Sequence, residues 1–286
     1  MDQFYAGKYH FSLGEKAYAI GILNITTDSG GRFLTPEKAA GRALEMQEQG
    51  ADMIDVGVQS ARAGSTPLSP GEELERLLPV LMQLHGRLAI PLSVDTFYPQ
   101  VAAEALKYGV SVLNDLNGFE SAEMVAAAAR SDCGCIVMHH RETKNDIITD
   151  VNQYFIEKMD ILKCAGIQKE RICFDPGIGF CKTQEQDLRL LGNVGRLRVP
   201  GCALLVAASR KRVIGAECGN PPYEQRLAGT VAAHSIAVAA RIWFARMIYR
   251  RRCRPQKSLL QSEWRALNKA EKQLFEKSLK KLQKRG

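Results

Sequence analysis

Short apolar runs recur along the first 240 residues, and each is followed by a polar or glycine-rich loop and then by a helix-like segment. Seven of these runs predict strands, with carboxyl ends at Asn24, Gly57, Asp95, Asp115, His140, Gly177 and Ser209. Residues 36–49, 71–84 and 98–107 have the spacing of amphipathic helices. Continuous apolar strands that alternate with helices predict a parallel sheet covered on its outer face. No glycine-rich dinucleotide motif follows the first strand, so the pattern favours a (β/α)8 TIM barrel.

Polar residues at the predicted strand ends indicate a functional site. Asn24, Asp95, Asn114, Asp175 and Ser209 all fall at or just beyond the carboxyl end of a strand. Barrel enzymes assemble their sites at this end, from successive loops. Any one of these residues could instead cap a helix or begin a turn. Five such residues at the same end of one barrel favour a functional site.

Composition and charge divide the chain into two parts. The 286 residues are 45% hydrophobic and 24% charged, which excludes wholesale disorder, collagen and coiled coil. The net charge of +8 is uneven, because residues 241–286 hold 15 Lys and Arg against 3 Asp and Glu, whereas residues 1–240 hold 24 against 28. We therefore predict a barrel domain over residues 1–240 and an atypical basic tail over residues 241–286.

Neither a membrane segment nor a disulfide framework is predicted. The longest apolar run, residues 227–245, is interrupted by His234 and Arg241, and the N-terminus lacks the pattern of a signal peptide. We expect a cytoplasmic protein with no membrane partner. The eight cysteines include no Cys-x-x-Cys pair, so Cys133, Cys173 and Cys202 are expected to be reduced core residues.

Seven motifs give the prediction a specific family. In order they are GILNITTDS (21–29), DVGVQSARAGS (55–65), SVDT (93–96), LNDLNGF (113–119), VMHHRE (137–142), DPGIGF (175–180) and SRKRVIG (209–215). Together they resemble the successive signatures of dihydropteroate synthase over residues 20–235. The resemblance implies a TIM barrel, usually dimeric. It also implies condensation of 6-hydroxymethyl-7,8-dihydropterin pyrophosphate with p-aminobenzoate, with Mg²⁺ as cofactor and release of pyrophosphate.

The resemblance also assigns the pterin site. It implies that Asn114 and Asp175 accept the donor edge of the pterin, that Lys211 binds its acceptor side, and that Met138 and Phe180 pack against the ring. A pterin carries donors beside acceptors, which suits an acid, an amide and a cation held out of water. Asp175 as a turn former, Lys211 as a helix-start residue and the other two as core residues remain alternatives.

Departure of the leaving group needs charges at both ends of the breaking bond. Asp95 resembles the carboxylate that stabilises positive charge on the pterin methylene, and with Lys211 it is expected to be catalytic. Asn24 resembles the residue that contacts Mg²⁺ and diphosphate. Arg62 and Arg212 are expected at the acceptor. His139 and His140 are expected to hold no metal, because neighbouring strand residues point to opposite faces.

Two loops depart from the family pattern. The first commonly reads TPDSFSDGG, whereas residues 26–31 here are shorter and lack its aromatic residue. The second commonly reads GGESTRPG, and here Arg62 is retained while Ala61 and Ala63 replace threonine and proline. Because these loops shape the p-aminobenzoate pocket in the family, we expect altered acceptor or sulfonamide tolerance.

The family's eighth strand, with its Arg-x-His-Asp signature, has no counterpart after Ala240. Ordinary codons for residues 240–248, read from the last base of the Ala240 codon, spell Ala-Asp-Met-Val-Arg-Ala-His-Asp. This suggests a single-nucleotide frameshift and a barrel without its closing strand. Alternatively, residues 242–249 act as a substitute strand in which Arg246 reaches the rim, and residues 262–284 form a genuine basic amphipathic helix.

Three other functions stay open beside the leading one. The missing Arg-x-His pair allows a degenerate paralogue that binds pterin without catalysis. A methyltetrahydrofolate methyltransferase-like domain shares the barrel class, although the Ser-Arg-Lys segment at residues 209–211 argues against it. The tail could also serve as an arm for nucleic acid or another acidic partner. The leading hypothesis has only small-molecule substrates, no nucleic acid, and a homodimer.

Overall fold

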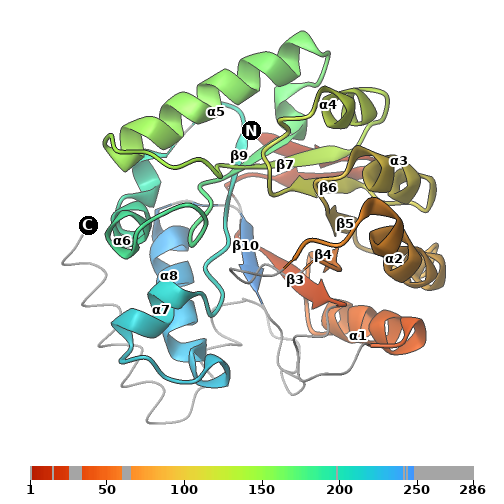
Figure 1. The fold of residues 1–286 in the computed structure, drawn as a ribbon, viewed down its shortest axis with the longest axis horizontal. Coiled ribbons are helices and arrows are strands. Elements are labelled where there is room, and N and C mark those ends of the chain that lie inside the picture. The colour runs from red at the N-terminus through yellow and green to blue at the C-terminus, as the bar shows by residue number, and fades with distance from the viewer. Residues whose placement is uncertain are drawn as a thin grey trace.

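The chain folds around a closed barrel of eight parallel strands, which Figure 1 shows enclosed by helices. The computed structural model describes residues 2–247 with the exception of residues 15, 26–33, 60–65, 198, 241 and 243. Around the barrel the strands follow in chain order from β3 to β10, and β10 pairs with β3 to close the ring. The predicted (β/α)8 TIM barrel is confirmed.

The barrel strands are short and follow one another in sequence. They are β3 (Tyr18–Asn24), β4 (Met53–Gly57), β5 (Leu92–Asp95), β6 (Val112–Asp115), β7 (Gly134–Met138), β8 (Ile172–Asp175), β9 (Ala203–Val206) and β10 (Phe244–Met247). A separate antiparallel hairpin comprises β1 (Gln3–Ala6) and β2 (Tyr9–Ser12).

Helices occupy the connections between these strands. They are α1 (Pro36–Glu48), α2 (Pro70–Leu84), α3 (Pro99–Lys107), α4 (Ala122–Ala129), α5 (Ile147–Cys164), α6 (Gln184–Gly192), α7 (Arg212–Glu217) and α8 (Leu227–Ala239). Short 3₁₀ turns lie at η1 (Lys169–Arg171), η2 (Val194–Arg196) and η3 (Tyr223–Gln225). Within the described residues, no helix is both long and apolar enough to cross a membrane.

Local signals fix where the helices begin. Ser69 and Glu72 form a reciprocal capping box at the start of α2, and Thr183 and Gln186 do the same for α6. A proline opens each of α1, α2 and α3, where its missing N–H costs nothing because that group has no partner within the helix. These starts lie within one residue of the positions predicted for the three helices.

The strand ends agree with the pattern in the first half of the barrel and differ in the second. β3, β4, β5 and β6 end at the predicted residues, whereas β7, β8 and β9 end two or three residues earlier, at Met138, Asp175 and Val206. After β8 the chain meets Pro176, which has no N–H for the ladder. The apolar runs therefore continue past the last paired residue, and burial alone does not mark the end of a strand.

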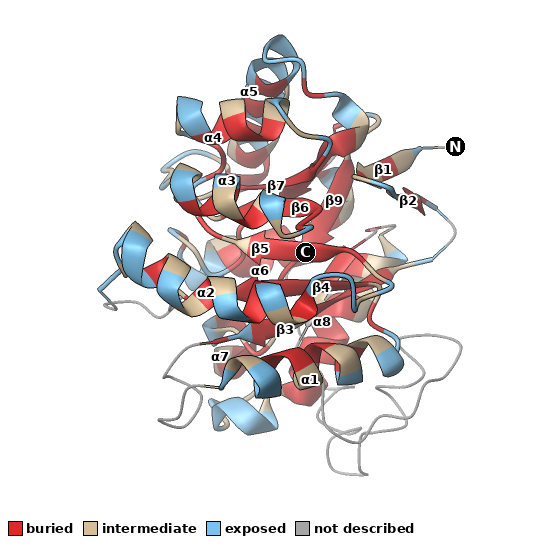
Figure 2. Cartoon of the chain, turned by 90° about the vertical axis from the view of Figure 1, so that its right-hand side faces the viewer, coloured by how far each residue is buried: buried red, intermediate tan, exposed pale blue. Residues whose placement is uncertain are grey.

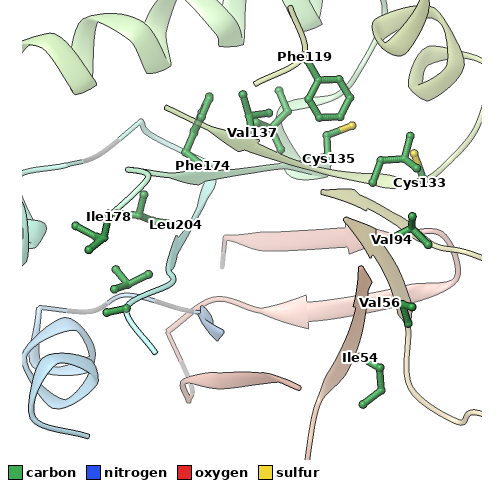
Figure 3. Packing of buried hydrophobic residues seen from close by; sticks show 14 of the residues in the cluster. Ile54, Val56, Val94, Phe119, Cys133, Cys135, Val137, Phe174, Ile178 and Leu204 are labelled. Atoms are coloured by element: carbon green, nitrogen blue, oxygen red, sulfur yellow. The ribbon is translucent and has the colours of Figure 1, made fainter. Parts of the chain in front are cut away.

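Two apolar layers sandwich the barrel wall. Side chains that point outward from the strands, among them Ile54, Val56, Val94, Val137 and Phe174, pack beneath the surrounding helices (Figure 3). Most residues of the barrel strands are buried, whereas the helices present their exposed residues to solvent (Figure 2). Cys133 and Cys173 are buried with free thiols, as expected for core residues, whereas Cys202 is only half-buried.

Inward-pointing side chains fill the amino end of the barrel with aromatic rings. Phe244 lies 5.3 Å from Phe4, 5.2 Å from Phe11 and 5.4 Å from Tyr18, measured between ring centroids. Phe4 and Phe11 come from the β1–β2 hairpin, which therefore plugs this end. Any site inside the barrel must open at the other end, where the strands terminate.

The eighth strand is present, which corrects the expectation that the barrel lacks it. β10 pairs with β9 at Phe244 and Ala245 and with β3 from Phe244 to Met247. The substitute-strand alternative is confirmed for these residues, and the barrel extends past residue 240, where the sequence placed its boundary. The pattern failed here because closure depends on pairing with two distant strands and not on a family motif. Residues 248–286 lie outside the described residues, and the frameshift hypothesis stays a prediction.

Candidate functional site

Above the aromatic plug, the side chains inside the barrel become polar. Strand residues alternate between faces, so residues two positions beyond an inward apolar residue also point inward. This places an inward polar residue after Met53, Val112, Cys173 and Phe244 in their strands. The resulting polar layer comprises Asp55, Ser93, Asp95, Asn114, Asp175 and Arg246. It faces the open, carboxyl end of the barrel, as the sequence predicted for Asp95, Asn114 and Asp175.

Asp55 is the centre of this layer. It is fully buried, and its two carboxylate oxygens accept hydrogen bonds from the Ser93 hydroxyl at 2.7 Å, the Asn114 amide at 3.0 Å and the Arg246 guanidinium at 2.6 Å. A buried charge needs such partners, because desolvation otherwise makes it costly. Asn114, expected to bind substrate, is itself 2% exposed and is oriented by Asp55.

Arg246 joins Asp55 to Asp95. Its Nε donates to Asp55, and one terminal nitrogen donates to Asp95 at 2.8 Å. Burial raises the pKa of Asp95 to about 7, although Arg246 opposes this shift, and the nearby carboxylates of Asp55 and Glu73 add to it. Burial acts against the charge of Arg246 itself, but Asp55 and Asp95 outweigh it and raise its pKa. One cation therefore joins two acids and favours the ionised form of Asp95.

Asp175 and Lys211 form the other side of the layer. Asp175 is 4% exposed, and its Oδ1 accepts the backbone N–H of Gly177 at 2.8 Å. Burial raises the pKa of Asp175, against the charge of Lys211, and burial lowers the pKa of Lys211 to about 8, against the charge of Asp175. The Lys211 ammonium donates to the carbonyl of Ile178 and lies 4.5 Å from the centroid of the Phe180 ring. An acid, a cation and an aromatic face thus lie together at this end of the barrel.

The loop after β8 depends on one glycine. Gly177 has a φ of +69°, and a Cβ placed there would lie 2.0 Å from the carbonyl oxygen of His139. Only glycine permits this approach, which brings the DPGIGF segment against the end of β7. Met138, at that end, is buried and pairs in register with Asp175.

His139 serves the structure of the rim. Its Nε2 lies 2.8 Å from Asp150, and its side chain is fully buried against Tyr154. Burial lowers the pKa of His139 to about 4, so the ring is neutral near pH 7. His140, the next residue, is only half-buried. The two rings thus differ in their surroundings.

Two predicted site residues, Asn24 and Arg212, lie outside this cluster. Asn24 ends β3 with an exposed side chain, beside Gly57, which in turn pairs with Asp95. Arg212 is exposed at the first turn of α7. Arg62 and the first loop at residues 26–31 lie outside the described residues, so the predictions for the acceptor loops stay predictions.

The described residues suit a weakly held magnesium ion and not a caged one. Among them no three His, Cys, Asp or Glu side chains gather so as to hold a metal ion. Asp55 and Asp95 are already engaged with Arg246. The exposed amide oxygen of Asn24 is a fitting single ligand for a hard cation that keeps most of its waters and binds phosphate oxygens.

The sequence did not single out Asp55. An aspartate inside the otherwise apolar run Met53–Gly57 was the available signal, since a charge on the inner face of a strand must find partners there. Arg246 gave the same signal inside the run that became β10, and the sequence had it only as an alternative.

The chain is similar to known proteins over most of its length. Residues 20–247 match the family described as pterin binding enzyme. The dihydropteroate synthase of Clostridium beijerinckii is 38% identical over 238 residues, covering 81% of this chain and 88% of the relative. That of Synechocystis is 38% identical over 247 residues, covering 82% and 85%.

Solved structures extend the likeness to the fold. A Xanthomonas albilineans dihydropteroate synthase with 4-aminobenzoic acid has a TM-score of 0.82 and 32% identity, covering 93% of this chain and 95% of its own. The same enzyme in complex with 7,8-dihydropteroate gives a TM-score of 0.76 and 31% identity, covering 86% and 92%.

Proposed function

This chain belongs to the pterin-binding enzymes and has the activity of a dihydropteroate synthase, and we propose that the polar layer inside its barrel binds and activates the pterin substrate. The enzyme is a transferase of folate biosynthesis. It joins 6-hydroxymethyl-7,8-dihydropterin pyrophosphate to p-aminobenzoate and yields 7,8-dihydropteroate and pyrophosphate. The observation that carries the proposal is the meeting of a buried acid, a buried amide and a lysine at the open end of the barrel.

We propose that Asp175 and Asn114 accept and orient the donor edge of the pterin, while Lys211 donates to its acceptor side. Asp175 is held in place by the Gly177 N–H, and Asn114 by Asp55, so both are positioned before substrate arrives. Phe180 and Met138 offer apolar surfaces for the ring. A desolvated acid beside a cation suits a ligand that presents donors next to acceptors.

Asp95 is proposed to act when the bond to diphosphate breaks. The carbon–oxygen bond at the pterin methylene breaks, the electron pair leaves with diphosphate, and positive charge develops on the methylene and ring. A fixed carboxylate stabilises that charge most strongly in a site that excludes water. The amine nitrogen of p-aminobenzoate then forms a bond to the methylene carbon and loses a proton.

Arg246 is proposed to stand in for the cation that the family carries in its Arg-x-His-Asp strand. It keeps Asp95 oriented and favours its ionised form. This observation weighs against the alternative of a paralogue that binds pterin without catalysis, since the closing strand of this chain still supplies a buried arginine to the layer.

The cofactor and the acceptor site follow from the resemblance. Asn24 would hold Mg²⁺, which when bound neutralises charge on the diphosphate. Arg62 and Arg212 are proposed to bind the carboxylate of p-aminobenzoate, the acceptor seen with the Xanthomonas albilineans enzyme. A homodimer and a cytoplasmic location are also expected.

Pterin affinity tests the proposal. We expect Asp175→Asn and Lys211→Ala each to weaken binding of a pterin analogue in calorimetry by roughly 5- to 150-fold, because a buried polar group left unpaired costs about 1–3 kcal/mol. Asp160→Asn and Lys163→Ala, exposed on α5, are matched controls and should bind as the parent does. Parent-like affinity in both site variants would show that the pterin binds elsewhere.

A further inference from the structure

The backbone of residues 178–180 surrounds the side chain of Lys211. The carbonyl of Ile178 accepts a hydrogen bond from the Lys211 ammonium, and the centroid of the Phe180 ring lies 4.5 Å from the same ammonium. Between these two residues, Gly179 has a φ of +81°, and a Cβ placed there would lie 3.1 Å from Cδ of Lys211. Three successive residues of one loop therefore lie against one lysine, and the path of this loop determines where the ammonium lies.

Asp187 holds the middle of this loop. It lies on α6, is 1% exposed, and its Oδ1 accepts the backbone N–H of Gly179 at 2.7 Å. Burial raises the pKa of Asp187, whereas the hydrogen bond from Gly179 lowers it. The charges of Lys182 and Lys211 lower it further, so the surroundings favour the carboxylate. Because a hydrogen bond to a carboxylate is stronger than one between neutral groups, Asp187 fixes the residue that lies against the Lys211 stem.

Lys182 holds the end of the loop. It is 8% exposed, and its ammonium donates to the backbone carbonyls of Phe180 at 3.0 Å and of His139 at 3.1 Å. His139 directly follows β7, so one side chain joins the end of β7 to the loop after β8. The ammonium therefore fixes the backbone of Phe180, whose ring faces Lys211.

We propose that Asp187 and Lys182 are positioning residues for Lys211: they hold the two loop residues that lie against the lysine and so set the affinity for the pterin. The inference rests on the proposed function, under which Lys211 donates to the pterin. Because both side chains are buried and bond to the loop backbone, they act through the loop. Neither was among the site residues predicted from the sequence.

The two residues also have opposite effects on the ionisation of Lys211. Burial lowers the pKa of Lys211 to about 8, the charge of Asp187 raises it, and the charge of Lys182 lowers it further. Burial lowers the pKa of Lys182 to about 8 as well, so the two ammonium groups lose their protons in the same range. The other charged or titratable groups that face Lys211 are Asp175 on β8, Arg246 on β10 and His234 on α8.

Hydrogen–deuterium exchange tests the anchoring without any ligand. We expect the Gly179 amide to exchange roughly fivefold faster or more in Asp187→Ala, because it loses its acceptor. In Asp187→Asn it should exchange at nearly the parent rate, since the amide oxygen still accepts. Glu185→Gln, exposed on the same helix, is the control. Exchange at the parent rate in Asp187→Ala, with an unchanged melting temperature, would overturn the anchoring.

Pterin affinity, measured by calorimetry well below the pKa of Lys211, tests the link to the ligand. We expect Asp187→Ala and Lys182→Met each to weaken binding of a pterin analogue roughly fivefold or more. Asp187→Asn, which keeps the acceptor, should stay within about twofold of the parent. Lys144→Met, at an exposed position before α5, should bind as the parent does. Parent affinity in Asp187→Ala or in Lys182→Met would remove that residue from the proposed role.

The pH dependence of binding separates positioning of Lys211 from a merely structural role. The proposed ligand contact needs the ammonium, so the affinity of the parent should fall as the pH rises through about 8. Asp187→Asn removes an anion and should move this fall to lower pH by about 0.5 or more, whereas Lys182→Met removes a cation and should move it to higher pH. Movement in the same direction in both variants, or in neither, would contradict the inference.

Failure of the proposed function gives a different result from failure of the positioning role. In the first case, Lys211→Ala binds the pterin analogue as the parent does, while the Gly179 amide still exchanges faster in Asp187→Ala. In the second case, Lys211→Ala binds weakly, while the variants of Asp187 and Lys182 keep the affinity and the pH dependence of the parent.

Discussion

At the scale of single residues, the site is organised by one cation among several acids. Arg246 is 14% exposed in its side chain and bonds both Asp55 and Asp95. Asp55 and Asp95 come from neighbouring strands, and the charge of Arg246 opposes the effect of burial on the pKa of Asp95, so without the arginine Asp95 would keep its proton to higher pH. The arginine therefore favours the ionised form of Asp95, and this has a consequence that can be measured as a function of pH.

The first prediction concerns Asp95. We expect Asp95→Asn to bind a pterin analogue as the parent does but to lower kcat on the order of 100-fold, because the carboxylate is needed mainly in the transition state. Binding by calorimetry and pyrophosphate release would be measured on the same preparation. Equal losses in affinity and in rate would contradict the proposed role.

The second prediction is the pH dependence that Arg246 imposes. The pKa of Asp95 is raised to about 7 and Asp95 acts as an anion, so kcat should rise with pH through about 7. Arg246→Met removes the positive charge that holds this pKa down, and the acid limb should therefore move to higher pH. Arg87→Met, an exposed arginine beyond α2, should leave the profile unchanged. A limb that moves to lower pH in Arg246→Met would refute the assignment.

At the scale of secondary-structure elements, the inner face of β10 contributes both to the stability of the barrel and to the candidate site. Phe244 completes the aromatic plug at the amino end, and Arg246, two residues on, completes the polar layer above it. Because alternate residues share a face, four residues are enough to link the stability of the barrel to its chemistry.

Phe244→Ala tests the plug. The ring is 1% exposed and contacts three other rings, so we expect the free energy of unfolding to fall by about 3–5 kcal/mol in urea denaturation. Met82→Ala, at a position 61% exposed on α2, is the matched control and should change it by about 0.5 kcal/mol or less. Similar values for both variants would mean that β10 does not hold the barrel together.

Some elements and site residues were predictable from local sequence signals, and others were not. The ends of β3 to β6 and the starts of three helices follow from local periodicity, caps and prolines. The role of Asp55 and the strand character of β10 do not, because each depends on partners more than a hundred residues away, as the contact between Asp55 and Arg246 shows. Strand pairing in a closed barrel joins residues that are far apart in the sequence. The hydrophobic pattern of one segment shows that it can form a strand but does not identify its partner.

At the scale of the whole molecule, the barrel-forming part of the chain ends at residue 247, and the strongly basic part begins after it. Residues 1–247 hold 26 Lys and Arg against 28 Asp and Glu, and residues 248–286 hold 13 against 3. The family match also ends at residue 247. The closing strand and the basic segment are thus adjacent in sequence but distinct in composition.

Two shortened chains test this division. A chain that ends at Met247 keeps β10, so we expect its melting temperature and pyrophosphate release to match those of the full chain. A chain that ends at Ala240 loses β10 and leaves the edges of β3 and β9 unpaired, so we expect it to melt at lower temperature, to aggregate and to lack turnover. Thermal melts, light scattering and pyrophosphate release on the three chains would decide. If the chain ending at Ala240 were as stable and active as the one ending at Met247, residues 244–247 would not be the strand that closes the enzyme.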